Sequence, residues 1–275
     1  MKQDIFFSIK GGKLSKIYFF CLYLSIEKKH LFVRTNQKTT DMKKILSILL
    51  GTAMSLSSQP ADAQKKQTTF SYGSHTYTME GTLTADAYDS KATGKVTFTN
   101  IPADYAEFEA VYTQFLGKTP HGAAAMMPMA MELYRRDRAL GLQCLQLVCY
   151  PTNVNSVTSI LNTKYGAAKF APENDPYLQP YLPAAVLKGA TPDNGYTPQR
   201  PYTVEMKASV NKHQSLQISG SGTVVYIYVM GKGWDTEQRQ VEAILQTGSQ
   251  LYQVFNCPSL YTQCKQIRGQ WKGLE

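Results

Sequence analysis

The chain has 275 residues, of which 43% are hydrophobic, and its 29 basic and 20 acidic side chains give a formal net charge of +9. Most of that excess lies in residues 1–63, and residues 64–275 keep 19 basic and 16 acidic residues, a net charge of +3. This near balance argues against the strongly basic body that nucleic-acid binding needs, so we expect no nucleic-acid partner.

Residues 42–63 have the layout of a secretory signal peptide. Two lysines follow Met42, an apolar run extends over residues 45–56, and Ala61 and Ala63 occupy the −3 and −1 positions of a signal-peptidase site. The run is shorter than the ~20 residues that cross a bilayer as a helix. We therefore expect cleavage after Ala63, export to the periplasm or the extracellular space, and no stable membrane span after cleavage.

Residues 1–41 precede this signal, and we interpret them as an extension from a misplaced start, with translation beginning at Met42. An apolar stretch at residues 17–26 is flanked by lysines, and as a second signal it would be redundant. An N-terminal membrane anchor is the alternative, although the stretch is about half as long as a spanning helix requires. Residues 64–275 are then a single domain, large enough to fold without disulfides or metals.

The first part of this domain predicts strands followed by helices. Residues 68–101 alternate apolar and polar side chains between turn residues, which is typical of two or three short antiparallel strands. Apolar residues at helical spacing then predict four helices, of which the third could also be a strand: 105–116, 119–136, 140–150 and 155–165. The second begins at Thr119-Pro120 and is apolar nearly all round, so we expect a buried central helix, kinked at Pro128.

Residues 170–202 hold seven of the thirteen prolines, a spacing that predicts a long loop without a regular element of any length. Alternating patterns beyond it predict five strands and a short final helix: 202–210, 216–218, 223–230 as the central strand, 241–245, 251–256, and the helix 261–267. Together the elements predict an α+β fold, with an antiparallel sheet from N- and C-terminal strands and the central helices packed on one face.

The C-terminal third carries a recognisable pattern of strand, glycine turn and final strand. Its residues are Val225-Tyr226, Gly231, Asp235-Thr236, Arg239, Val254-Phe255 and Ser259-Leu260. This pattern resembles the end of an uncharacterised family of exported domains from gut-type Bacteroidota, with relatives in Firmicutes. The family has no assigned activity, so the resemblance implies an exported compartment and carries over no catalytic residue.

Four cysteines remain after the expected cleavage: Cys144, Cys149, Cys257 and Cys264. On helices, the first two would face different sides and the last two would lie ~10 Å apart, so neither pair can close on itself. Export permits a disulfide between the two pairs, which makes all four candidate disulfide partners. Buried apolar thiols are the simpler alternative, which we favour. No pair has the spacing of a zinc or redox site, and we expect no metal and no cofactor.

The sequence contains no motif of a serine nucleophile or a phosphate loop. His121 falls in the first turn of a predicted helix, where the helix dipole disfavours its protonation and where we expect it to face solvent. Residues 135–138 carry their own counter-charge, which indicates a solvated helix face rather than a phosphate site. The neighbouring carboxylates Glu107 and Glu109 should face different ways on a helix.

Aromatic side chains are the remaining candidates for binding, because exposed rings stack on sugars and anchor protein partners. We expect Trp234, after a glycine turn, and Tyr177, Tyr181 and Tyr196, on the proline-rich loop, to form the contact surface. The sequence therefore predicts an exported, non-enzymatic binding module for a protein or glycan partner. The alternative is a periplasmic hydrolase whose site is assembled only in the fold, with His121 or one of the first two cysteines taking part.

Overall fold

The computed structural model describes residues 67–81, 83, 91–166, 177–209, 214–218 and 220–274, all within one compact unit, Ala63–Glu275. The predicted signal peptide, residues 1–41 and part of the proline-rich loop lie outside the described residues. The strands are β1 Gln67–Tyr72, β2 His75–Gly81, β3 Thr93–Phe98, β4 Tyr202–Ala208, β5 Gln214–Ile218, β6 Gly220–Met230, β7 Gln238–Gln246 and β8 Tyr252–Asn256. The helices are α3 Tyr105–Gln114, α4 Pro120–Arg136, α5 Arg138–Val148 and α6 Val154–Tyr165.

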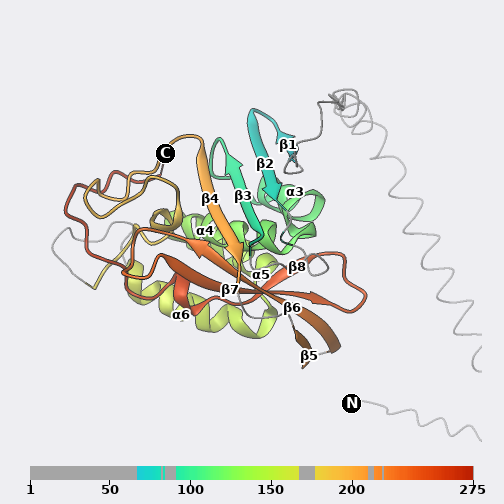
Figure 1. The fold of residues 1–275 in the computed structure, drawn as a ribbon. Helices are drawn as coiled ribbons and strands as arrows, with labels where there is room; N and C mark the ends of the chain where they lie inside the picture. Colours follow the sequence, from blue (N-terminus) through green and yellow to red (C-terminus); the bar gives the residue numbers. More distant parts are fainter. Residues whose placement is uncertain are drawn as a thin grey trace, which may run out of the picture. The chain divides into compact units, whose positions relative to one another are not determined.

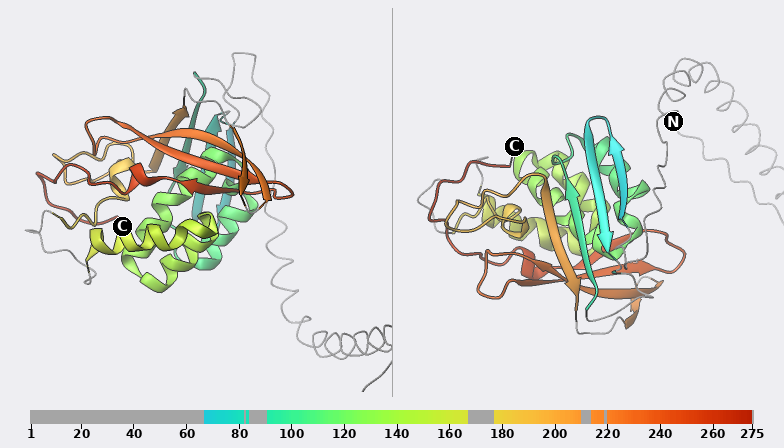
Figure 2. Two further views of the ribbon diagram at one scale, coloured as in Figure 1. Left: turned by 90° about the horizontal axis from the view of Figure 1, so that it is seen from below. Right: turned by 45° about the horizontal axis from the view of Figure 1, so that its top comes forward.

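The strands form one antiparallel sheet in the order β1-β2-β3-β4-β6-β7-β8, with β5 paired to one part of β6. N-terminal and C-terminal strands meet at the β3–β4 pair, which runs from Thr93 opposite Lys207 to Phe98 opposite Tyr202. The helices pack on one face of the sheet (Figure 1, Figure 2). The predicted α+β architecture is therefore confirmed, with β6 as an inner strand.

β6 joins two parts of the sheet that run in different directions (Figure 1). Its C-terminal half pairs with β4 over three positions, 227–229 opposite 206–208, and its N-terminal half pairs with β5 instead. The sheet therefore curls, and α4 lies inside the curl in contact with β3, β6, β7 and β8. This position explains why the sequence of α4 is apolar nearly all round.

Local signals in the sequence account for α4. Thr119 caps the helix by accepting a hydrogen bond from the Gly122 amide at 3.1 Å. Pro120 occupies the first helical position, where an N–H would have no acceptor within the helix, so its missing N–H costs no hydrogen bond. Every residue from Pro120 to Tyr134 is buried, and the helix continues through its internal proline. Gly141 allows α5 to approach α4 closely, because a Cβ there would lie 2.0 Å from the Cα of Tyr134.

Two sequence-based predictions about helices are wrong. α6 begins one residue before Asn155, which therefore lies inside the helix rather than at its cap. Residues 261–267 form no helix, since the chain makes a 3-10 turn at Pro258–Leu260 and continues irregularly. The side-chain amide of Gln179 pairs there with the N–H and the C=O of Cys264, at 2.9 and 2.7 Å. Bonds to the proline-rich loop thus replace helical ones.

Candidate functional site

The aromatic residues predicted to form a contact surface lie mostly in the core. Tyr196, Tyr181 and Trp234 are 0%, 5% and 7% exposed, whereas Tyr177 is 73% exposed. The rings of Tyr181 and Tyr196 stack with their centroids 4.9 Å apart, and the Tyr196 hydroxyl donates to the Lys265 carbonyl at 2.7 Å. The expectation that these three rings are exposed is wrong, because the proline-rich loop folds inward and packs against the C-terminal segment.

The four cysteines are buried free thiols, so the disulfide between the two pairs is not formed in this structure. Burial raises the pKa of Cys144, Cys149 and Cys264 to about 12, and it raises the pKa of Cys257 well above its usual value. Because the thiolate is the reactive form, these side chains are unreactive near neutral pH. Their burial argues against Cys144 and Cys149 as participants in a hydrolase site.

His121 is 1% exposed and does not face solvent as expected. Its Nδ1 lies 3.1 Å from the Leu83 carbonyl oxygen, and burial lowers its pKa to about 4 although that hydrogen bond acts in the opposite direction. The first turn of α4 packs against β3, where Gly94 leaves room for the ring: a Cβ there would lie 3.1 Å from it. His121 is thus a neutral residue of the core.

Arg135, expected on a solvated helix face, is instead largely buried and paired with Glu132. Its Nε and Nη2 donate to the two carboxylate oxygens at 2.9 and 2.8 Å, and Arg136 Nε donates to the same carboxylate at 2.7 Å. The Glu132 side chain is 0% exposed and that of Arg135 is 9% exposed. These charges therefore stabilise the end of α4 internally rather than facing a phosphate group.

One of the two neighbouring carboxylates of α3 is buried in the first turn of this helix. Glu107 is 3% exposed and accepts hydrogen bonds from His75 Nδ1 at 2.7 Å, the Tyr77 hydroxyl at 2.8 Å and the Ala103 amide at 2.7 Å. Asp104 accepts from the Glu107 amide at 2.8 Å, and the three-residue spacing of these acids is the capping-box signal that could have identified Glu107. Its partners on β2, His75 and Tyr77, are brought to it by tertiary packing, which no local pattern indicates.

The part of the sheet formed by β1–β4 has a polar outer face and an aromatic inner face. Paired positions in the four strands form one outward row: Thr69, Thr78, Thr97 and Thr203. The adjacent positions form an inward row that packs towards the helices: Phe70, Tyr77, Phe98 and Tyr202. Since successive side chains of a strand point to opposite faces, this register places the hydroxyl groups outside and the rings inside.

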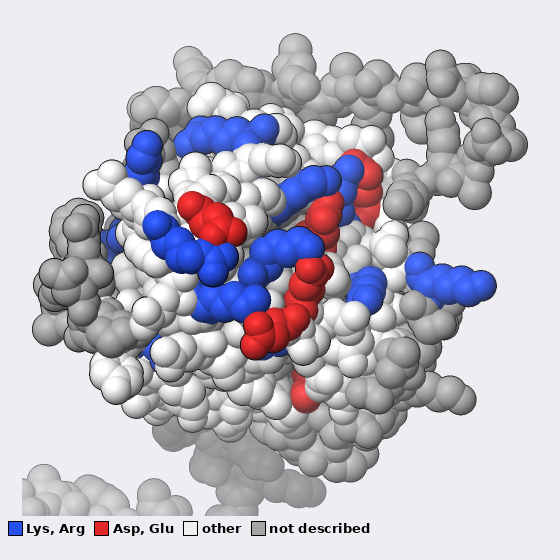
Figure 3. Space-filling model, turned by 60° about the vertical axis from the view of Figure 1, so that its left-hand side comes forward, with Lys and Arg blue, Asp and Glu red and all other residues white. Residues whose placement is uncertain are grey.

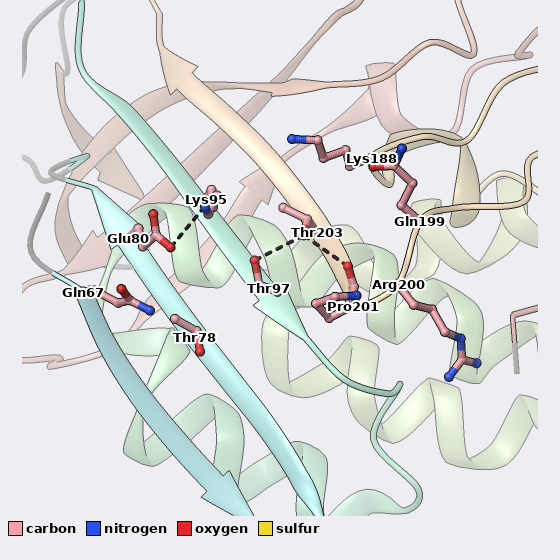
Figure 4. Close-up of a pocket in the computed structure, with 10 residues that line it drawn as sticks. All are labelled: Gln67, Thr78, Glu80, Lys95, Thr97, Lys188, Gln199, Arg200, Pro201 and Thr203. Carbon is pink, nitrogen blue, oxygen red and sulfur yellow. Dashed lines mark hydrogen bonds and ion pairs between the residues drawn. The ribbon is translucent and has the colours of Figure 1, made fainter.

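The threonine row forms part of the floor of a groove with a volume of about 380 Å³ (Figure 4). The described residues that line it are Gln67, Thr78, Glu80, Lys95, Thr97, Lys188, Gln199, Arg200, Pro201 and Thr203. Its wall is the segment 188–201, which is held to β4 by a 2.8 Å hydrogen bond from the Lys188 N–H to the Thr203 carbonyl. Of these lining residues, none is aromatic.

The two lysines of the groove make exposed ion pairs. Lys95 Nζ lies 3.1 Å from Glu80, and Lys188 Nζ lies 2.8 Å from Glu205 on β4; these four side chains are 22–52% exposed. Figure 3 shows a face of the molecule on which cationic and acidic side chains interleave. The lining itself carries three cations, Lys95, Lys188 and Arg200, and one carboxylate.

Arg200 is oriented by an aromatic ring at the end of the wall. Its guanidinium carbon lies 4.9 Å from the centroid of the Tyr202 ring, and its Nη2 donates to the Tyr202 hydroxyl at 3.1 Å. Its Nη1 donates to the Asn100 side-chain oxygen at 3.3 Å. The Arg200 guanidinium therefore points away from the threonine row (Figure 4), and the groove offers hydroxyl, amide and ammonium groups, which bind polar ligands.

Within the described ranges, no three His, Cys, Asp or Glu side chains gather as the ligands of a metal ion would. The helices that the structure describes are too short or too polar for any of them to cross a bilayer.

A family model described as "Domain of unknown function (DUF6935)" matches residues 100–268. The match includes β4 and the wall of the groove, whereas β1–β3, which supply much of its floor, precede it. No curated protein and no solved structure matches the chain. Because the matched segment covers more than half of its length, the chain belongs to the DUF6935 family, a domain family of unknown function.

Proposed function

We propose that the protein is an exported, non-enzymatic binding module whose ligand surface is the groove on the outer face of β1–β4. The observation that carries this proposal is the in-register threonine row beside the wall that holds Lys188 and Arg200 (Figure 4). Hydroxyl groups both donate and accept hydrogen bonds, and neighbouring strands repeat them at ~4.8 Å. This is a regular surface for a ligand rich in hydroxyl groups.

Export to the periplasm or the extracellular space is proposed from the signal-like layout of residues 42–63, and an origin in gut-type Bacteroidota from the C-terminal pattern. Mass spectrometry of the protein from its native host tests the export proposal. We expect the isolated chain to begin at Gln64. A chain that begins upstream of Gln64 and stays in the cytosol would contradict it.

Of the two partner classes, the groove favours a glycan over a protein. A stable protein interface covers a patch of roughly 800 Å² and 20–30 residues per partner, whereas the described lining of the groove has ten residues. A cavity of about 380 Å³ lies within the range of small-molecule sites, roughly 300–1,000 Å³. Tyr177, which is exposed, is retained as a contact candidate outside the groove.

A glycan array probed with the full-length protein and two variants tests this proposal. The double variant Thr78→Val, Thr97→Val removes two hydroxyl groups from the floor and should lose about ten-fold or more in binding, because unpaired polar groups of the ligand are then desolvated without compensation. Thr113→Val, on α3 outside the groove, is the matched control and should bind as wild type does. An unchanged array profile in the double variant would remove the groove from the proposal.

A hydrolase is the second candidate, and one contact favours it. His75 Nδ1 lies 2.7 Å from the buried Glu107, the arrangement in which a carboxylate orients a catalytic imidazole. Incubation with chromogenic ester, peptide and glycoside substrates decides between the candidates. Turnover that His75→Gln abolishes in a folded protein would favour the enzyme, and the lack of turnover on all three substrate classes favours the binding module.

A further inference from the structure

One edge of the sheet is covered by the chain itself, whereas the other edge is open. At the β8 edge, the Tyr150 N–H donates to the Val254 carbonyl at 2.8 Å. The Asn153 side-chain amide donates to the Phe255 carbonyl of the same strand, and a register shift interrupts the β7–β8 pairing. The opposite edge is β1, whose six residues are all exposed but one and which pairs with β2 alone among the described strands (Figure 1). A further strand can therefore add only at β1.

The backbone groups that β1 presents at this edge follow from its pairing with β2. The Thr76 N–H donates to the Thr99 side chain at 3.0 Å, and the Thr76 carbonyl accepts from the Thr99 N–H at 3.1 Å, so neither group bonds to the opposite residue, Ser71. Opposite residues of an antiparallel pair alternate between bonded and non-bonded positions. Gln67 and Thr69 are therefore non-bonded like Ser71. The N–H and C=O groups of these three residues point to the open edge.

β1 carries none of the features by which edge strands avoid pairing with another chain. Lysines, prolines and bulges are the usual protection of an exposed edge. The strand has no charged residue and no proline, and its pairing with β2 runs without a register shift from Gln67 to Tyr72. On its inner face, Phe70 stacks on Phe115 with the ring centroids 5.8 Å apart, but Thr68 and Tyr72 are exposed. The edge is therefore accessible from both faces.

A second copy of β1 matches this edge better than a strand of another protein. Charged groups select foreign partners, and β1 has none. Two antiparallel copies can place Thr69 opposite itself on a two-fold axis, the symmetry of most homodimers. Gln67 then lies opposite Ser71 of the second copy, and every outward N–H of one strand meets a C=O of the other. The antiparallel direction also separates the N-terminal ends of the two strands, which Lys65 and Lys66 precede in the sequence.

We propose that the protein forms a homodimer in which two copies of β1 pair antiparallel, with Thr69 on the two-fold axis. The sheet then continues from one copy into the other, and both copies turn the outer face of β1–β4 to the same side. The threonine row crosses the axis, because Thr69 is its member on β1. Two six-residue strands supply fewer residues than the roughly 20–30 per partner of a standard interface, so we expect a reversible dimer. The inference does not depend on the proposed ligand.

Sedimentation velocity of the protein purified from its native host tests the dimer. The share of dimer should rise over about a hundred-fold increase in protein concentration. Thr69→Pro should abolish the dimer because it removes the central outward N–H, and it should leave the fold intact because that N–H makes no bond to β2. Thr69→Val is the matched control, which keeps the N–H and should dimerise as wild type does. If the proline variant does not fold, Thr69→Lys keeps the test open: like charges then face each other on the axis, and the chain should be monomeric at low salt.

Cysteine cross-linking tests the register of the two strands. Bonded residues of an antiparallel pair have Cα atoms about 5.5 Å apart, a separation that a disulfide spans. Thr69→Cys should therefore form a covalent dimer when it is treated with oxidised glutathione. Gln67→Cys is the control on the same strand and should not, because the two copies of this position lie ~14 Å apart along the strands. The native cysteines at 144, 149, 257 and 264 are buried and should not interfere.

A wild-type chain that stays monomeric at every concentration would overturn the inference. If such a monomer instead binds another protein in a way that Thr69→Pro abolishes, the open edge belongs to a foreign strand, which also overturns it. A dimer that persists in both the proline and the lysine variants would place the interface elsewhere on the molecule. Equal cross-linking by Thr69→Cys and Gln67→Cys would contradict the two-fold axis at Thr69.

Discussion

The imidazole Nδ1 of His75 lies 2.7 Å from the Glu107 carboxylate, and this contact fastens the β1–β2 hairpin to the helix layer. The two residues are 32 positions apart in the chain. Burial, together with the hydrogen bond to Glu107, raises the pKa of Tyr77, which shares the same carboxylate. One side chain thus joins a helix start to a strand, and its removal should affect both.

Glu107→Ala should lower the free energy of unfolding by about 3 kcal/mol, because it leaves the buried Tyr77 hydroxyl and the Ala103 amide without their acceptor. Glu109→Ala, on the exposed side of the same helix, should change stability by no more than ~0.5 kcal/mol. Urea unfolding of both variants measures the difference. Equal losses would mean that Glu107 acts only through helix propensity.

Stability should fall in mild acid because of His121. Its pKa is 6.5 when the chain is unfolded and about 4 when it is folded, so between these values the unfolded chain binds more protons. The free energy of unfolding therefore decreases as the pH falls from 6.5 to 4, by about 3 kcal/mol at ~1.36 kcal/mol per pKa unit. Urea unfolding at several pH values should show a shallower decrease for His121→Gln than for wild type; identical pH profiles would contradict the assignment.

The thiols of the domain should be protected from reagents in the folded protein. Burial raises the pKa of Cys144, Cys149 and Cys264 to about 12, so at pH 8 almost none of these side chains is a thiolate. A chromogenic disulfide reagent should therefore react slowly with the native protein and rapidly after unfolding in guanidinium. Rapid reaction without denaturant would show an exposed thiol, and no reaction after unfolding would show that disulfides have formed.

Gly141→Ala should destabilise the protein although alanine favours helices by about 1 kcal/mol over glycine. The new methyl group would lie 2.0 Å from the Cα of Tyr134, and backbone cannot move aside as a flexible side chain can. We expect a loss of about 3 kcal/mol or more, measured by denaturant unfolding. Gln143→Ala, on an exposed position of the same helix, is the control and should stay near wild type. A stabilised Gly141 variant would contradict the close packing of α4 and α5.

The sequence predicts correctly the features that depend only on neighbouring residues, such as the start of a helix or the alternation of a strand. Thr119-Pro120 marked the start of α4 because a cap and a proline act within one turn, and alternation along residues 202–208 marked β4 because a half-buried strand exposes every second side chain. Prolines between 177 and 201 likewise excluded long helices and strands there. These features require no knowledge of a distant partner.

The sequence does not predict which side chains are buried by segments that lie far away in the chain. Tyr181 and Trp234 look like surface residues in a loop and a turn, but both are buried: the Tyr181 ring packs against Tyr196 and Trp271, and Trp234 bonds to the Thr262 carbonyl. Residues 261–267 have a helical pattern but bond to Gln179 instead. The groove depends on the register of four strands, and a shift of one residue would exchange its threonines for aromatic rings.

The β3–β4 pair joins two strands that are synthesised at different times. Thr97 and Thr203 face each other across this pair but are 106 residues apart, with α3–α6 between them. Closing so long a loop is slow, and the ribosome delivers the first three strands long before their partner. A nascent chain that stalls before β4 has most of the floor but lacks the strand to which the wall bonds, so capture of the proposed ligand would report that β4 has emerged and paired.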